Sequence, residues 1–292
     1  MNTTFNEKYE YIDIDPIKRG AFGDIYRIKD KKVKTEYILK KLRKEDPNNP
    51  DIEGTDNETF ENEKNFLLSV KGTNIVNIID YYNNQNDKYY YFVFEKMDGD
   101  LDKLLKNYKK GMSSKLIRKI FSQINSGLKI MLKKGKTHRD LKLSNILFSY
   151  TNNKEDDFII KIGDFGLTTD LSSISKTTKQ AGTELFRAPE IEKGKYSNKC
   201  DLYSIGIILY MLKTGEYIFD GKTHYDKLKN KYANKIKKEI DDTKLNNLIK
   251  KLVVLDPHKR MEWEDYFNDP FFKVNDEDVK ESVDCKIKFL II

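Results

Sequence analysis

The first hundred residues cluster or alternate apolar and polar positions over short segments that turn signals separate. The segments are "YIDIDPIKRG" (11–20), "DIYRIKD" (24–30), "EYILKKL" (36–42), "NIVNIIDYY" (74–82) and "YYYFVFEKM" (89–97). Short runs rich in β-branched and aromatic residues, bounded by turn residues, are typical of strands. The pattern therefore predicts a small sheet in this part of the chain.

One predicted helix interrupts these strands. In "TFENEKNFLLSV" (59–70), Phe60, Lys64, Leu67 and Leu68 recur at helical spacing, with the apolar members on one side. The preceding residues, 46–58, are polar and predict a loop.

The pattern becomes helical from Leu101 onward. The change falls at "EKMDGD" (95–100), where Gly99 between two aspartates is a turn signal and predicts a joint between two lobes. The clearest helix candidates are "LDKLLKNY" (101–108), "SKLIRKIFSQINSGLKIML" (114–132), "LYSIGIILYML" (202–212) and "LNNLIKKLVVL" (245–255).

The composition is that of a soluble globular protein that folds without disulfide bonds or structural metal ions. The chain has 292 residues, of which 35% are charged and 38% hydrophobic, enough for one large domain or two lobes. The formal charge is +7, but the basic residues are mixed with 47 acids, so specific nucleic-acid binding is not expected. Cys200 and Cys285 are far apart and lack ligand spacing, which predicts neither a zinc site nor a disulfide framework.

The sequence predicts neither a signal peptide nor a membrane-spanning segment. The N-terminal residues have no apolar stretch resembling a signal peptide, and the longest apolar run, "IGIILYML" (205–212), is too short to span a bilayer. A cytoplasmic location and the absence of a membrane span are therefore the default expectations.

The segment "KTHRDLKLSNILF" (136–148) gathers polar groups just ahead of an apolar run. Asp140 could accept a proton from a hydroxyl, Lys142 could neutralise nearby charge, and Asn145 could reach a metal ion. "KIGDFGL" adds Asp164 after a strand-like run. Carboxylate and amide oxygens suit Mg²⁺, which usually shares its coordination with substrate phosphates. These residues therefore predict phosphoryl transfer.

Two N-terminal segments are compatible with that chemistry, although each has another interpretation. Gly20 and Gly23 in "IKRGAFGDIY" would let backbone amides approach an anion, or would belong to an ordinary hairpin with a glycine bulge. Lys40 ends an apolar strand, where an inward-facing ammonium needs an anion such as Glu63 on the following helix. The alternatives are a surface lysine, or a register in which Lys41 is the functional lysine.

Taken together and in this order, the segments resemble the protein-kinase family from about Tyr11 to Phe272. The resemblance rests on the glycine loop, the strand lysine, the helix glutamate, "HRDLKLSN", "DFG" and "APE". It implies an α+β, two-lobed fold with a small β-rich N-lobe containing one main helix (about 11–97) and a larger, mostly α-helical C-lobe (about 100–272). Residues 273–292 are then a C-terminal tail.

The resemblance implies ATP and Mg²⁺ as cofactors and gives the site residues roles. Asp140 would be the catalytic base, Lys142 would assist the transferred phosphoryl group, and Asn145 and Asp164 would hold the metal ion. The positions that it assigns to ATP binding are Ile17, Gly20, Ala21, Phe22, Gly23, Ile25, Lys40, Glu63, Glu95, Met97 and Asp100.

Within that set, "FEKMDGD" resembles the hinge between the lobes. Phe94 would be the gatekeeper, the backbone of Glu95 and Met97 would bond adenine, and Asp100 would contact the ribose. Other motif positions would be structural: Phe165, His138 and Leu67 in an internal hydrophobic spine, Thr183 against the catalytic loop, Glu190 paired with Arg260, and Asp201 bracing the catalytic loop.

The catalytic-loop lysine, Lys142, and Thr183 of "GTELF" resemble those of serine/threonine kinases, which implies protein substrates. Arg139 before the catalytic aspartate often accompanies control by phosphorylation of the activation segment, and hence an upstream kinase. The candidate phosphorylation sites are Ser172, Ser173, Ser175, Thr177 and Thr178.

The protein is expected to be a monomer.

The sequence departs from the family pattern at Lys18, Ile38, Leu143 and Tyr203, none of which removes a catalytic group. A pseudokinase or scaffold would explain Lys18 and Ile38, although such proteins usually lose one of the catalytic residues. A small-molecule phosphotransferase would share the Asp and Asn loop but would lack "GTELFRAPE". A nucleic-acid-binding module would rest on net charge alone.

Overall fold

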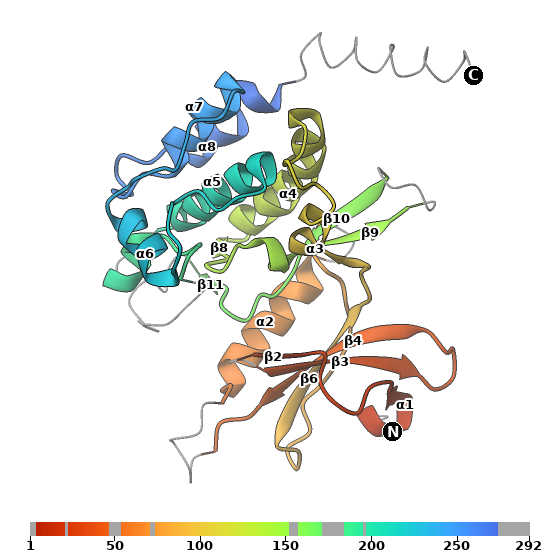
Figure 1. Cartoon of the computed structure of the whole chain (residues 1–292). Helices are drawn as coiled ribbons and strands as arrows, with labels where there is room; N and C mark the ends of the chain where they lie inside the picture. The colour runs from red at the N-terminus through yellow and green to blue at the C-terminus, as the bar shows by residue number, and fades with distance from the viewer. Residues whose placement is uncertain are drawn as a thin grey trace, which may run out of the picture. The chain divides into compact units, whose positions relative to one another are not determined.

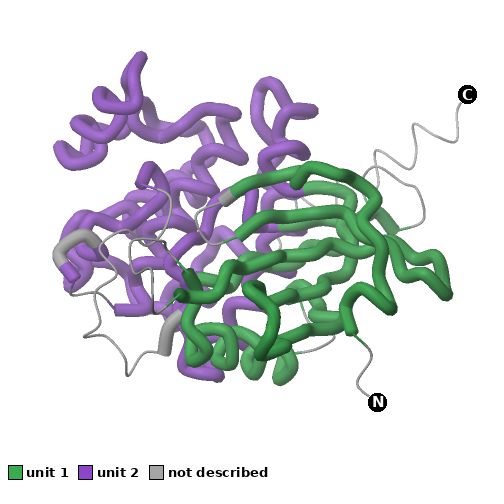
Figure 2. The backbone as a smooth tube through the Cα atoms, turned by 90° about the horizontal axis from the view of Figure 1, so that it is seen from below, with its two compact units in different colours: residues 1–99, 147–166 green, residues 100–146, 167–292 purple. Residues whose placement is uncertain are grey.

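The computed structural model describes residues 4–20, 23–46, 54–70, 74–151, 157–170, 184–194 and 197–273. The chain forms two compact units (Figure 2). Unit 1 comprises Met1–Gly99 and Leu147–Gly166, and unit 2 comprises Asp100–Ile146 and Leu167–Ile292.

The predicted small sheet is present in unit 1, and its described strand pairs are antiparallel (Figure 1). Its order is β1-β3-β4-β6-β5, with β2 also paired to β3. The strands are β1 (Tyr9–Tyr11), β2 (Lys18–Gly20), β3 (Gly23–Asp30), β4 (Glu36–Arg43), β5 (Ile78–Tyr82) and β6 (Tyr89–Glu95).

The segment 11–20, predicted as one strand, is instead split between β1 and β2. Pro16 lies in the break and has no amide hydrogen to donate to a ladder. Asp13 is turned toward β3, where its carboxylate accepts two hydrogen bonds from Arg27 at 2.6 and 2.8 Å. A proline and a side-chain ion pair therefore replace strand pairing here.

The predicted strand 74–82 is also shorter than expected, because only β5 (Ile78–Tyr82) joins the sheet. The residues before it bond to β10 (Phe158–Ile162), which neighbours β9 (Ile146–Tyr150) in a second sheet. The Ile162 amide donates to the Asn74 carbonyl, and the Val76 amide donates to the Ile162 carbonyl, both at 2.9 Å.

The helix predicted over 59–70 is α2 (Asn57–Ser69), and it packs on one face of the sheet. Asp56 caps it by accepting a 2.7 Å hydrogen bond from the Thr59 amide. The buried ring of Phe60 stacks on Tyr90 and Phe92 of β6, with centroid distances of 4.3 and 4.6 Å. The helical apolar stripe therefore meets the alternate residues of β6 that share a face.

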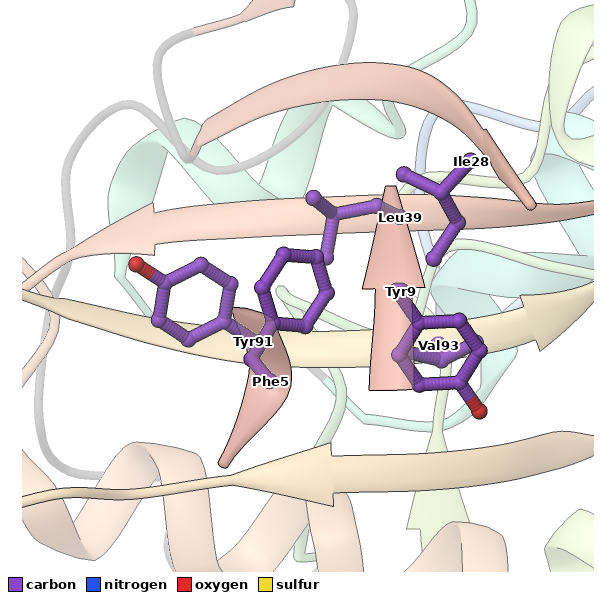
Figure 3. Packing of buried hydrophobic residues seen from close by; sticks show 6 residues of the cluster. All are labelled: Phe5, Tyr9, Ile28, Leu39, Tyr91 and Val93. Carbon is purple, nitrogen blue, oxygen red and sulfur yellow. The ribbon is translucent and has the colours of Figure 1, made fainter. Parts of the chain in front are cut away.

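The opposite face of the sheet is covered by the N-terminal residues, which include the short helix α1 (Phe5–Lys8). Phe5 stacks on Tyr91 at 4.7 Å, and β1 adds a strand beside β3. Because α2 and this cluster bury opposite faces, side chains on both sides of the strands are withdrawn from water. This buried set, called the aromatic cluster below, consists of Phe5, Tyr9, Ile28, Leu39, Tyr91 and Val93 (Figure 3).

Unit 2 is mostly helical, as predicted, and the four helix candidates are confirmed with slightly different ends. The helix α5 is buried along nearly its whole length and contacts both α4 and α7 (Figure 1). The helices are α3 (Leu101–Leu105), α4 (Ser114–Lys133), α5 (Lys199–Thr214), α6 (His224–Tyr232), α7 (Thr243–Leu252) and α8 (Trp263–Phe267).

Short elements connect these helices. The described residues include the 3₁₀ turns η1 (Leu143–Asn145), η3 (Pro189–Lys193) and η4 (Pro270–Phe272), and β8 (Lys136–Thr137) pairs with β11 (Thr169–Asp170). In the described ranges, none of the helices has the length and apolar character needed to cross a membrane.

The expected joint near 95–100 coincides with the end of the first segment of unit 1, at β7 (Gly99–Asp100). Leu147–Gly166 lies in the range expected for the C-lobe and groups with unit 1 in the structure. The reason is a set of long-range contacts: besides the bonds between β10 and residues 74–76, Lys161 pairs with Glu95 at 2.6 Å.

Replacing Phe5 by alanine is expected to lower the free energy of unfolding by about 3 kcal/mol, because it removes a buried ring from the aromatic cluster. Urea denaturation of purified protein measures this difference. Ile14→Ala is the control, since Ile14 is 99% exposed and its truncation should change stability by less than about 0.5 kcal/mol. Equal effects of the two changes would show that the N-terminal residues do not cover the sheet.

Candidate active site

A buried charge cluster lies in unit 1 around Lys40 of β4. Lys40 is 6% exposed, and its Nζ donates to Glu63 Oε1 at 3.0 Å and to Asp164 Oδ1 at 3.3 Å. Burial alone would lower the pKa of Lys40, but attraction to Glu63 and then to Asp164 outweighs it, so the pKa is raised. The ammonium therefore stays charged inside the protein, and the predicted pairing of Lys40 with Glu63 is confirmed.

The register of β4 decides between the two candidate lysines. Leu39 belongs to the aromatic cluster, so Lys40 points to the opposite face, toward α2. Lys41 points back to the cluster side, where its Nζ lies 4.1 Å from the centre of the Tyr89 ring. The structure therefore pairs Lys40, and not Lys41, with Glu63.

Asp164 and the two residues after it have a backbone shaped for this cluster. Asp164 has φ 60°, a left-handed conformation that is strained for an aspartate. Phe165 is buried, with its ring 5.2 Å from that of Phe66 on α2. A Cβ added at Gly166 would come 2.9 Å from Lys40 Nζ, so the glycine leaves the room that the ammonium occupies.

The glycine-rich segment forms the β2–β3 hairpin, in which Gly20 is opposite Gly23. Gly23 has φ 138°, and a Cβ there would lie 2.5 Å from the Lys41 carbonyl oxygen. The hairpin is closed by the Ile17 amide, which donates to the Ile25 carbonyl at 2.8 Å. Ala21 and Phe22, at the tip, lie outside the described residues.

The predicted hinge begins at the end of β6. The Glu95 amide donates to the Asn77 carbonyl at 3.1 Å, and the Asp98 amide donates to the Phe148 carbonyl at 2.9 Å. Between them, the Met97 amide donates no hydrogen bond to any residue in the described part of the chain. A backbone donor at that position is suited to an acceptor on a ligand, as the resemblance requires.

The flanking hinge residues have structural contacts of their own. Phe94 is buried and lies opposite Ile38 across the β4–β6 ladder. The carboxylate of Asp100, predicted to contact the ribose, caps α3 by accepting from the Lys103 amide at 2.8 Å. That carboxylate therefore has a role in the fold whether or not it contacts a nucleotide.

The catalytic-loop candidates come together within unit 2. Asp140 is 7% exposed, and its Oδ2 accepts hydrogen bonds from Lys142 Nζ at 2.7 Å and from Asn145 Nδ2 at 3.0 Å. Asn145 Nδ2 also donates to the Asp140 carbonyl at 2.9 Å. These bonds fix the Asp140 carboxylate between a cation and an amide.

Asp201 on α5 braces this loop, as expected. Its carboxylate oxygens accept from the His138 and Arg139 amides at 2.7 and 2.8 Å, and Arg139 has φ 67°. Burial raises the pKa of Asp201, although the two amide hydrogen bonds to its carboxylate oppose the shift. His138 is fully buried, and its Nδ1 accepts from the Asp140 amide at 3.3 Å, which fits the expectation of a packed histidine.

The expected pair of Glu190 and Arg260 is also confirmed. The guanidinium is fully buried and donates to both carboxylate oxygens, at 2.5 and 3.0 Å. It also lies 5.1 Å from the ring of Tyr203, the residue that departs from the family pattern. Thr183 and the candidate phosphorylation sites, Ser172, Ser173, Ser175, Thr177 and Thr178, lie outside the described residues.

Comparison with known proteins identifies the family. A model described as the protein kinase domain matches residues 11–272. The chain belongs to this family. Its kinase domain is 36% identical over 261 residues to calcium-dependent protein kinase 4 of Plasmodium falciparum, an alignment covering 87% of this chain and 47% of that protein.

Two further relatives support the same assignment. Serine/threonine-protein kinase atg1 of Dictyostelium discoideum is 32% identical, over 92% of this chain and 40% of its own. Cyclin-dependent kinase 11B of Rattus norvegicus is 32% identical, over 79% of this chain and 50% of its own. The chain therefore spans half or less of the length of these relatives.

The protein kinase family uses ATP with Mg²⁺, and the residues of this kinase domain fit that pair. Asn145 donates through Nδ2 to Asp140, which leaves its amide oxygen as the metal-ligating atom, and the Asp164 side chain is 46% exposed. In the described ranges, no cluster of three or more His, Cys, Asp or Glu residues could hold a metal alone. Mg²⁺ would thus depend on phosphate oxygens and water for its remaining ligands.

Sequence reasoning missed three side chains that hold the segment before "APE". Ser204, Tyr217 and Lys231 each donate a hydrogen bond to a backbone carbonyl in residues 184–186. Lys231 is fully buried, yet it is only one of 54 basic residues in the sequence and carries no local signal. Only the tertiary structure distinguishes it from a surface lysine.

Lys40→Met is expected to lower the free energy of unfolding by about 3 to 5 kcal/mol, because it leaves the buried Glu63 carboxylate without its ammonium partner. The matched control is Lys41→Met, which changes the neighbouring lysine on the other face and should cost about 1 kcal/mol or less. Chemical denaturation of both variants makes the comparison. A larger loss in Lys41→Met would contradict the observed register.

Proposed function

We propose that this chain transfers the γ-phosphate of ATP to serine and threonine hydroxyls of protein substrates. The observation that carries the proposal is the buried Asp140 carboxylate, fixed by Lys142 and Asn145. Such an arrangement supplies a proton acceptor, a cation and an amide oxygen from one short loop. Phosphoryl transfer by positioning and charge stabilisation uses these groups.

On the catalytic loop, Asp140 orients the substrate hydroxyl and accepts its proton as the oxygen attacks phosphorus. Bound ATP supplies the phosphoryl group, and Mg²⁺ neutralises charge on its phosphates. Lys142, 2.7 Å from the Asp140 carboxylate, can turn its ammonium toward the phosphoryl oxygens. Asn145 Nδ2 keeps Asp140 in place by donating to its carboxylate and to its backbone carbonyl.

On the nucleotide side, Lys40 binds the phosphates of ATP and Glu63 holds Lys40 in place. The raised pKa of Lys40 keeps its ammonium charged for this role. Asp164 is the metal ligand of unit 1 and contacts the same ammonium at 3.3 Å. The β2–β3 hairpin offers backbone amides to the phosphates, and the Met97 amide offers a donor to adenine.

Specificity for serine and threonine is supported by Lys142 in the catalytic loop. The relative from Dictyostelium discoideum is named a serine/threonine-protein kinase, which agrees with this proposal. The scaffold alternative has less support, because Lys40, Asp140 and Asp164 are all present and form hydrogen bonds in the fold. Lys18 lies in β2, and Ile38 shares a face with Lys40, so neither disrupts those contacts.

Asp140→Asn is expected to lower the rate of transfer by about 10²- to 10⁴-fold, because an amide keeps the shape of the carboxylate but cannot accept the proton. The measurement is transfer of labelled γ-phosphate from ATP with Mg²⁺ to casein and to myelin basic protein. Asp265→Asn is the control, since Asp265 is an exposed aspartate of α8. Equal label incorporation by wild type and Asp140→Asn would remove Asp140 as the base.

We also propose that phosphorylation between Ser172 and Thr178, by an upstream kinase or by the chain itself, raises activity. Arg139 supports this proposal, because its Nε donates to the Leu167 carbonyl at 2.5 Å, at the start of the segment that leads to those sites. A phosphate pairing with Arg139 would order that segment. Phosphatase treatment should therefore lower the transfer rate several-fold, whereas an unchanged rate with full dephosphorylation by mass spectrometry would exclude this control.

A further inference from the structure

A short segment before "APE" is held to unit 2 by its backbone. Side chains from three separate places in unit 2 donate to three consecutive carbonyl oxygens of this segment, so its path is fixed independently of its own side chains. The bonds are Lys231 Nζ to the Glu184 carbonyl at 2.6 Å, Tyr217 Oη to the Leu185 carbonyl at 2.6 Å, and Ser204 Oγ to the Phe186 carbonyl at 2.8 Å.

Two of the donors, Lys231 and Ser204, are buried, and Tyr217 is half-buried. Lys231 on α6 is fully buried, and an ammonium at such a position is costly unless polar groups surround it. Burial raises the pKa of Tyr217, so its hydroxyl keeps the proton that it donates. The segment is therefore a rigid part of unit 2.

Helix α5 connects this segment to the catalytic loop. Asp201 of α5 holds the His138 and Arg139 amides next to Asp140, and Ser204, three residues later on α5, holds Phe186. Residues three apart on a helix are neighbours on one face. Neighbouring side chains of α5 therefore hold both the loop of Asp140 and this segment, which makes the segment a candidate contact for a polypeptide that brings a hydroxyl to Asp140.

Glu184 offers an exposed carboxylate at that place. Its side chain is 47% exposed, and Oε2 lies 3.0 Å from His224 Nε2. Oε1 accepts no hydrogen bond from any residue in the described ranges, although a carboxylate has room for several donors. The nearby Asp226 is already engaged, because it forms the capping box of α6 with Thr223.

We propose that Glu184 is a specificity-determining residue that selects protein substrates carrying a lysine or arginine a few residues from the phosphorylated serine or threonine. This inference rests on the proposed kinase activity. The basic side chain binds Oε1 of Glu184, and Lys231 is a positioning residue that fixes the backbone of Glu184. A substrate with an acidic residue at the same position is repelled by the carboxylate.

The test is a set of peptides with one fixed serine, in which each flanking position carries lysine, alanine or glutamate in turn. Wild type is expected to prefer lysine over alanine at one position by about two- to fivefold in kcat/KM, the range of an exposed ion pair. Glu184→Gln should abolish this preference, and Glu184→Lys should reverse it toward glutamate. Glu239→Gln is the matched control, because Glu239 is an exposed glutamate paired with Lys250, and it should keep the wild-type preference.

The outcomes separate the inference from the proposed function. If wild type phosphorylates neither the peptides nor casein and myelin basic protein, the proposed function fails. If it phosphorylates them with the same lysine-to-glutamate ratio as Glu184→Gln, the function stands and the inference is overturned.

The role of Lys231 has its own readout. Lys231→Met should raise the KM for the lysine-containing peptide several-fold and leave the KM for ATP unchanged, and Lys231→Arg should restore the peptide KM. Equal changes in both KM values would show that Lys231 only stabilises the fold. Because a change at this buried site can prevent folding, the exposed Glu184 variants decide the proposal in that case.

Discussion

The buried carboxylate of Asp201 is the interaction on which the arrangement of unit 2 depends. It sits on α5, the most buried helix, and satisfies two amides of a loop whose Arg139 has a left-handed backbone. A strained loop persists only where its surroundings hold it. Here one carboxylate on a core helix holds the strain, so packing around α5 and the geometry of Asp140 are coupled.

In unit 1 the central buried charge is the ammonium of Lys40. The buried ammonium of Lys40 contacts the buried Glu63 carboxylate and the more exposed Asp164 carboxylate, and a Cβ at Gly166 would crowd it. Both faces of the sheet are covered, by α2 and by the aromatic cluster, so β4 cannot slip by one residue without exchanging Lys40 for Lys41. The apolar packing on either side of the strand therefore specifies which lysine is charged and buried.

Much of this could be predicted from the sequence, because local patterns and the order of the motifs determine it. A lysine ending an apolar strand needs an anion, which pointed to Glu63, and the resemblance pointed to Asp201 and to the pair of Glu190 and Arg260. Long-range contacts outside the motifs could not be predicted. Residues 74–76 bond to β10 instead of the main sheet, Leu147–Gly166 joins unit 1, and Lys231 is buried, all through tertiary contacts that leave no local pattern.

The N-terminal residues 5–10 lie before the part of the chain that matches the family, yet they complete the sheet. A recombinant fragment that began at the family boundary would remove Phe5 and Tyr9 and uncover an apolar face with Leu39, Tyr91 and Val93. It would also leave part of β3 as an open edge. Open edges beside apolar surface promote self-association. The useful boundary for expressing this kinase domain is thus set by packing, several residues ahead of the sequence match.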